Sequence, residues 1–326
     1  QYRSCKALHD AVKRYQADGG SVVILEPSTG KVIAMCNIPD FDPDSYNIVE
    51  DISQYNNKAT FEAYEPGSVV KPLVMAAALD RGAVTPNTLF NDTGEEKIDR
   101  FTIRNSDLEA YGMVTMTQVL QNSLNTGMIF VMRKLGGSLM KDYYEKFGFG
   151  QRTGIQLNSE SAGVIDSLYK DSEIYYATGS YGQGFTVTVL QLAQSYAALA
   201  NQGMLMQPYI VEEQRYPDGT VKAAVPTAVR QVISKKTAVT IGAMLVSVIE
   251  EGHATSAAVN GYYMAGKTGT AQVARQDGGV GYEVGVTKAT FAGYGPIEDP
   301  AFAMVVMLDH PRTNQWASET AAVVYG

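Results

Sequence analysis

The chain has 326 residues, of which 45% are hydrophobic and 18% charged, an ordinary composition for a globular protein with a sizeable core. Its formal net charge of −8 argues against a protein that binds nucleic-acid phosphates, which would carry a basic surface. No apolar run reaches the roughly 18 residues of a membrane-spanning helix. Because the length slightly exceeds what one hydrophobic core usually organises, we expect two lobes.

The chain begins at Gln1 without a signal-peptide pattern, so we interpret it as a processed or trimmed fragment that lacks any upstream anchor. Its two cysteines, Cys5 and Cys36, are far apart in the sequence and form no C-x-x-C motif. They could pair or remain reduced, and we favour two independent thiols.

The beginning of the chain predicts a helix followed by a β-hairpin. Residues Ser4–Gln16 have helical spacing and are followed by a glycine pair, which is a stop signal. Two apolar runs, Ser21–Leu25 and Lys31–Cys36, flank a Pro-Ser-Thr-Gly turn and predict the hairpin. The next stretch, Pro39–Asn57, is rich in Asp, Asn, Pro and Ser, so we expect a surface loop.

Helical periods dominate the middle of the chain, and several of the predicted helices end at a glycine, the favoured C-terminal stop. These helices are expected at Val69–Asp80, Thr115–Leu135, Leu139–Phe147, Val189–Asn201 and Lys235–Glu251. The tail returns to strands, which are expected at Tyr262–Ala274, Ala289–Pro296 and Ala301–Leu308.

Two strands at the start and three at the end predict one five-stranded antiparallel sheet built from both chain ends, with the helices inserted between them. The predicted class is α/β (α+β). Within a single domain covering 1–326, we assign 1–60 and 255–326 to the sheet lobe and 61–254 to the helical lobe.

The pattern S-x-x-K occurs four times, whereas roughly one occurrence is expected by chance in a chain of this length. Three occurrences have ordinary explanations: Ser28 lies in the hairpin turn, Ser138 resembles a helix N-cap, and Ser167 lies in a polar connection. Ser68 differs because it follows a Glu-Pro-Gly turn and opens an apolar helical run. Its hydroxyl would lie at the positive end of that helix, with Lys71 on the same face.

Two further patterns follow in order along the chain. S-x-N occurs at Ser45-Tyr-Asn47 and at Ser123-Leu-Asn125, and K-T-G occurs once, at Lys267-Thr-Gly269. The small residues around K-T-G would let another chain approach the edge of its strand. A solvated lysine followed by a bulge glycine does not explain why the three patterns occur together.

These patterns resemble the active-site motifs of class B penicillin-binding proteins, in which S-x-x-K, S-x-N and K-T-G occur together. The resemblance rests on Tyr64–Pro72, Asn122–Met128 and Gly266–Gln272, and extends to Ser180–Thr188 and Ser21–Asp44. It therefore covers nearly the whole chain, in order.

The resemblance is closer to the septal, cell-division type than to the elongation type, judging from the residues around Ser123 and Tyr181. One departure is Leu124, which is apolar, at a position that has no catalytic duty in the family.

The resemblance implies the penicillin-binding transpeptidase fold and a serine D,D-transpeptidase that cross-links peptidoglycan stem peptides ending in D-Ala-D-Ala. Ser68 would attack the penultimate carbonyl and form an acyl-enzyme. Lys71 would take the hydroxyl proton if burial and repulsion from Lys267 keep it neutral. Ser123 would relay the proton to the leaving amine, and Asn125 would hold Lys71 and the substrate amide.

The same resemblance assigns the remaining site residues. Lys267, Thr268 and Thr270 would bind the terminal carboxylate, and Gly269 would keep the strand edge clear for the peptide. The backbone N–H groups of Ser68 and Thr270 would form the oxyanion hole. No metal or cofactor is expected, since the sequence has no H-E-x-x-H motif and no paired Cys/His spacing.

The resemblance also implies partners and a location. The expected ligands are stem peptides of a lipid-linked peptidoglycan precursor and β-lactam antibiotics. The expected protein partners belong to the division or elongation machinery and include a glycosyltransferase, whereas nucleic acid is not expected. The full-length protein would be anchored at the extracytoplasmic face of the bacterial cell membrane.

Two alternatives share the motifs. A serine β-lactamase would use Ser68 and Lys71 in the same roles, but it needs a carboxylate or modified lysine to activate water, and Glu62 and Glu65 are too close in sequence to assign. A non-catalytic β-lactam sensor or divisome scaffold would keep the fold without peptide turnover. A Ser–His–Asp hydrolase is disfavoured because no G-x-S-x-G motif is present.

Overall fold

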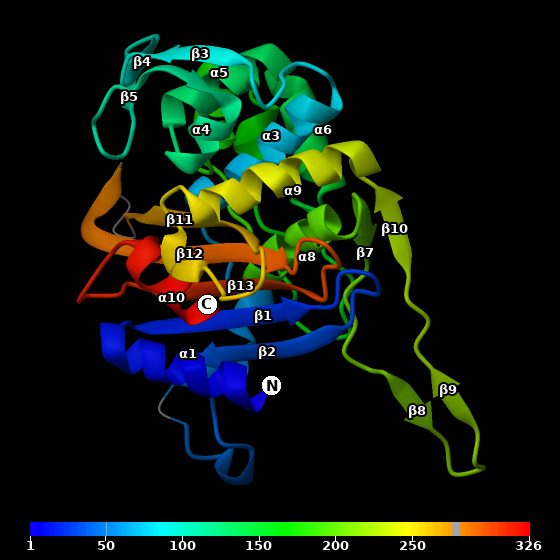
Figure 1. The fold of residues 1–326 in the computed structure, drawn as a ribbon. Helices are drawn as coiled ribbons and strands as arrows, with labels where there is room; N and C mark the ends of the chain where they lie inside the picture. The colour runs from blue at the N-terminus through cyan, green and yellow to red at the C-terminus, as the bar shows by residue number, and fades with distance from the viewer. Residues whose placement is uncertain (50, 276–280) are drawn as a thin grey trace.

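The computed structural model describes residues 1–326 except Glu50 and residues 276–280. Its base is a five-stranded antiparallel sheet with the order β11-β12-β13-β1-β2 (Figure 1). The strands are β1 (Gly19–Leu25), β2 (Val32–Ile38), β11 (Ala265–Ala274), β12 (Tyr282–Gly295) and β13 (Phe302–Asp309). The sheet built from both chain ends is thereby confirmed, and its central pairing joins β1 to β13, with Val22 opposite Val306.

Helices cover both faces of this sheet, as Figure 1 shows. The terminal helices α1 (Tyr2–Tyr15) and α10 (Ala321–Tyr325) contact it on one face, and α8 (Val189–Ala200) packs on the other. Neighbouring residues that point to opposite faces, such as Val22 and Val23, are both buried because each face is covered.

The helical lobe is organised around α3 (Lys71–Asp80), which contacts α5, α6 and α9. This helix is apolar almost all round and is buried from Lys71 to Ala78, as expected of a helix inside a core. The other helices of the lobe are α4 (Met116–Gln121), α5 (Asn125–Leu135), α6 (Gly137–Lys146), α7 (Glu173–Ser180) and α9 (Lys235–Glu250).

Short elements complete the chain. Four two-stranded sheets pair β3 (Leu89–Asp92) with β6 (Gly112–Thr115), β4 (Glu95–Ile98) with β5 (Phe101–Arg104), β7 (Met204–Met206) with β10 (Ala228–Gln231), and β8 (Glu213–Arg215) with β9 (Val221–Ala223). Single helical turns are α2 (Lys58–Phe61), η1 (Pro43–Ser45), η2 (Ile52–Tyr55), η3 (Gly67–Val70), η4 (Asp166–Tyr169), η5 (Thr255–Ala257) and η6 (Ala317–Glu319). Among the helices of the described residues, none is both long and apolar enough to cross a bilayer.

Three predictions were wrong. Thr115–Leu135 is not one helix. Thr115 is the N-cap of α4, which ends at Gln121, and a second helix, α5, begins at Asn125. Ser138 lies inside α6, whose N-cap is a glycine. Cys5 and Cys36 are not independent thiols: they form a disulfide with a Cα–Cα distance of 5.5 Å, which ties α1 to β2. The division of the chain at 60/61 and 254/255 stays a prediction.

Candidate active site

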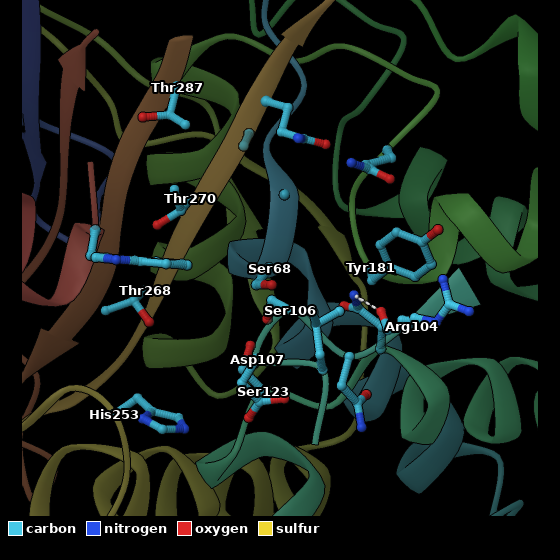
Figure 2. Close-up of a pocket in the computed structure, with 18 of the residues that line it drawn as sticks. Ser68, Arg104, Ser106, Asp107, Ser123, Tyr181, His253, Thr268, Thr270 and Thr287 are labelled. Carbon is cyan, nitrogen blue, oxygen red and sulfur yellow. Dashed lines mark hydrogen bonds between the residues drawn. The ribbon is translucent and has the colours of Figure 1, made fainter. Parts of the chain in front are cut away.

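A cleft of about 970 Å³ lies between the edge strand β11 and the helical lobe. Figure 2 shows it with Ser68 and Ser123 on one side and Thr268 and Thr270 of β11 on the other. The three sequence motifs, far apart in the chain, therefore meet around one cavity. The site residues that line the cleft are Ser68, Ser123, Asn125, Thr268 and Thr270.

Ser68 lies in the 3-10 turn η3, just before α3, rather than in the α-helix itself. Close backbone contacts hold this turn: the Gly67 N–H donates to the Gly182 carbonyl at 3.0 Å. A Cβ on Gly182 would lie only 2.0 Å from the Gly67 carbonyl oxygen, and one on Gly269 would lie 2.9 Å from a methyl carbon of Val69. Glycine is needed at both positions so that the three segments can approach the nucleophile turn.

Lys71 is fully buried, and its side-chain nitrogen Nζ makes three hydrogen bonds. Nζ donates to the Ser123 carbonyl at 2.5 Å, to Ser123 Oγ at 3.2 Å and to Asn125 Oδ1 at 2.8 Å. Burial holds the pKa of Lys71 well below its usual range, Lys267 lowers it further, and Asp107 opposes the shift. Both lowering causes are those expected from the sequence.

No hydrogen bond joins Ser68 Oγ to Lys71 Nζ among the described residues. Hydrogen bonds between a nucleophile and its base are often long before a substrate binds. Here the amine of Lys71 is hydrogen-bonded to the S-x-N motif instead of to Ser68. The motif has a backbone suited to this contact, since Ser123 has a φ of 54°, in the left-handed region that few non-glycine residues adopt. Leu124, the apolar middle residue, is 1% exposed and packs in the core.

The K-T-G segment lies on β11, an edge strand of the five-stranded sheet. Lys267 is fully buried, and burial lowers its pKa to about 7. Its Nζ donates to the Thr268 carbonyl at 3.2 Å and to Thr268 Oγ1 at 3.4 Å. Thr270 Oγ1 accepts a hydrogen bond from the Ala317 N–H at 3.1 Å, which links β11 to η6.

The walls of the cleft contain residues that motif reasoning missed, including Arg104, Asp107, His253 and Trp316. Figure 2 labels His253 and Asp107 among the side chains that line the cleft. Burial, and after it Lys267, lowers the pKa of His253. Arg104 ends the short strand β5, and the other three lie in loops, none of them in a sequence pattern. Tyr181, also in the wall, belongs to a segment that the resemblance had singled out.

Glu62 and Glu65, the carboxylates considered for activating water in a β-lactamase, form contacts outside the cleft. Glu65 accepts hydrogen bonds from the Gly184 N–H and the Tyr282 hydroxyl, both at 3.1 Å, and burial raises its pKa. Glu62 lies 3.7 Å from the Lys58 ammonium nitrogen, one helical turn away. Neither residue lines the cleft.

Comparison with known proteins decides the family. The model of the penicillin binding protein transpeptidase domain matches residues 20–325. The chain belongs to the penicillin-binding protein transpeptidase family. Stage V sporulation protein D of Bacillus subtilis is 37% identical over 98% of this chain, and the peptidoglycan D,D-transpeptidase FtsI of Escherichia coli is 32% identical over 98%.

This transpeptidase domain spans 50% and 52% of those two relatives, about half of their length. Among solved structures, penicillin binding protein 3 of Mycobacterium tuberculosis in complex with aztreonam superposes with a TM-score of 0.90 at 31% identity. The match covers 100% of this chain and 74% of that chain. The resemblance to class B penicillin-binding proteins and their fold is confirmed.

Proposed function

We propose that this transpeptidase domain cross-links peptidoglycan stem peptides through an acyl-enzyme on Ser68. The observation that carries the proposal is Lys71: a fully buried amine with a lowered pKa, hydrogen-bonded to Ser123 and Asn125 beside a serine that opens into the cleft. A lysine kept neutral by burial can accept the proton that a serine must lose to become a nucleophile.

In the first step, Ser68 Oγ attacks the penultimate D-Ala carbonyl of the donor peptide and its proton passes to Lys71. The backbone N–H groups of Ser68 and Thr270 are proposed to stabilise the oxyanion. When the tetrahedral intermediate collapses, the C–N bond to the terminal D-Ala breaks. Ser123, 3.2 Å from Lys71 Nζ, relays the proton to that leaving amine.

Lys267, Thr268 and Thr270 are proposed to bind the terminal carboxylate of the donor. The support is that Thr268 and Thr270 of the edge strand β11 line the cleft, and that Lys267 Nζ donates to Thr268 Oγ1. A Cβ on Gly269 would meet Val69, so this glycine lets β11 approach the nucleophile turn. In the second step an amine of a neighbouring stem peptide attacks the ester carbonyl. The new amide forms as the Ser68 ester bond breaks, and the proton that the amine loses passes through Lys71 to Ser68 Oγ.

The proposed ligands are stem peptides of the lipid-linked precursor and β-lactams, which would acylate Ser68. Penicillin binding protein 3 of M. tuberculosis has been solved with aztreonam and with ampicillin. We place the domain at the extracytoplasmic membrane face, with partners of the division or elongation machinery that include a glycosyltransferase. The support is that the relatives include FtsI and a sporulation protein.

The test supplies a peptide ending in D-Ala-D-Ala together with an amine acceptor, and follows released D-Ala and cross-linked product by mass spectrometry. A transpeptidase gives both products, and Ser68→Ala gives neither. Hydrolysed donor without cross-linked product, or rapid turnover of penicillin, would contradict the proposal and favour a hydrolase or β-lactamase. A stable penicillin adduct without any D-Ala release would favour a sensor.

A further inference from the structure

A buried carboxyl group lies beside the S-x-N motif but outside the cleft. Asp92, at the end of β3, is 2% exposed. Its Oδ1 accepts hydrogen bonds from the Gly94 N–H at 3.1 Å and Thr126 Oγ1 at 2.6 Å. Its Oδ2 accepts from Asn105 Nδ2 at 3.0 Å and the Tyr111 N–H at 2.9 Å. Since a buried carboxyl group is costly without such bonds, Asp92 fixes its own turn and the segments around Asn105, Tyr111 and Thr126.

Asn105, also 2% exposed, forms the second half of this arrangement. Its Oδ1 accepts from the Thr126 N–H at 3.3 Å and lies 3.1 Å from Thr126 Oγ1, whose single proton is directed to the closer Asp92 Oδ1. Asn105 therefore acts as a cap for the first turn of α5, whose own N-cap residue is a leucine without a side-chain cap. We call Asp92, Asn105 and Thr126 the Asp92 network.

The Asp92 network joins the backbone at 104–105 to the backbone at 125–126, and these two segments position the side-chain amide of Asn125. Asn125 precedes Thr126, and Arg104 precedes Asn105. The Asn125 side chain bridges them, because its Oδ1 accepts from Lys71 Nζ at 2.8 Å and its Nδ2 donates to the Arg104 carbonyl at 2.9 Å. Figure 2 shows Arg104 in the cleft wall at this point. A shift of α5 relative to the wall would break one of these two bonds.

We propose that the Asp92 network is a positioning device that holds Asn125 against Lys71 during acylation of Ser68. The inference rests on the proposed function. Because a small misplacement of a catalytic group is costly in rate, weakening the network should slow acylation by more than the loss of stability explains.

The test compares two threonines with the same local chemistry. Thr126 Oγ1 donates to buried Asp92 at 2.6 Å, and Thr153 Oγ1 donates at 2.6 Å to Glu160, a buried carboxyl group that does not line the cleft. Thr126→Val and Thr153→Val each remove one such bond, so both should lower the thermal midpoint. For Thr126→Val we expect acylation by a fluorescent penicillin to slow about tenfold, because a small misplacement of Asn125 is costly in rate.

Thr153→Val should keep the wild-type acylation rate, and Thr126→Ser should restore it because the hydroxyl returns. In an Asn125→Ala background, Thr126→Val should slow acylation little further, since the amide that it positions is already gone. If Thr126→Val does not fold, Thr126→Ala, which also lacks the hydroxyl and suits a helix, takes its place.

Equal acylation rates for Thr126→Val and Thr153→Val would overturn the inference, as would a full tenfold loss in the Asn125→Ala background. A wild-type protein that forms no penicillin adduct would instead overturn the proposed function, and this inference with it.

Discussion

The second-order rate of acylation should follow a bell-shaped pH profile set by two buried lysines. The rate rises as pH increases through the pKa of Lys71, because only the neutral amine can accept the Ser68 proton. It falls as pH increases through about 7, because Lys267 then loses the charge that is proposed to bind the substrate carboxylate. One unit above that pKa only about a tenth of Lys267 is charged, so we expect about a tenfold fall at pH 8.

The substitution that isolates this effect is Lys267→Arg, since a guanidinium stays charged throughout the range. Its overall rate can be lower because the pocket is tight, but its normalised profile should keep the rising limb and lose the falling one. The matched control is Lys288→Arg on the neighbouring strand β12, where Lys288 Nζ pairs with Asp309 at 2.7 Å outside the cleft. This control should keep the wild-type profile.

The assay is adduct formation with a fluorescent penicillin at substrate concentrations far below saturation, measured between about pH 5 and 9 so that the profile reports the free enzyme. A wild-type rate that keeps rising through pH 8 would refute the reasoning. A falling limb that survives in Lys267→Arg would assign it to another group and would refute the role given to Lys267.

Three further predictions address the frame of the site. Replacing Cys5 and Cys36 by serine opens a disulfide across 31 positions, so the free energy of unfolding should fall by about 3–4 kcal/mol in denaturant titrations, while acylation at 25 °C stays unchanged. Gly269→Ala places a Cβ 3.0 Å from the Val69 backbone nitrogen, so β11 must move away from η3; acylation should slow at least about tenfold, and an unchanged rate would show that this contact is dispensable. Tyr64→Phe removes a buried 3.0 Å hydrogen bond to β12 and should cost about 1–2 kcal/mol of stability by thermal unfolding, with no change in acylation rate.

The sheet could be predicted because its strands have long apolar runs and clear turns between them. The prediction for β12 began at Ala289, whereas the strand starts at Tyr282, since its first half alternates poorly and is partly exposed. The four two-stranded sheets were missed because strands of three or four residues carry almost no periodic signal.

The site was less fully predictable. The three motifs identified the residues that meet at the cleft, and Lys71 with Ser123 and Asn125 shows the contact expected of them. Helical periodicity continued through Ser123, however, because nothing in the local sequence signals its left-handed φ of 54°. Wall residues such as His253 were invisible for the same reason: they reach the cleft through tertiary packing of loops.

The most direct test of the central claim is to digest the penicillin adduct and locate the modified residue by tandem mass spectrometry. The account predicts a single acylated site at Ser68, with an unmodified protein in Ser68→Ala. Acylation at Ser28, Ser138 or Ser167, the serines of the other three S-x-x-K patterns, or an adduct that persists in Ser68→Ala, would contradict it.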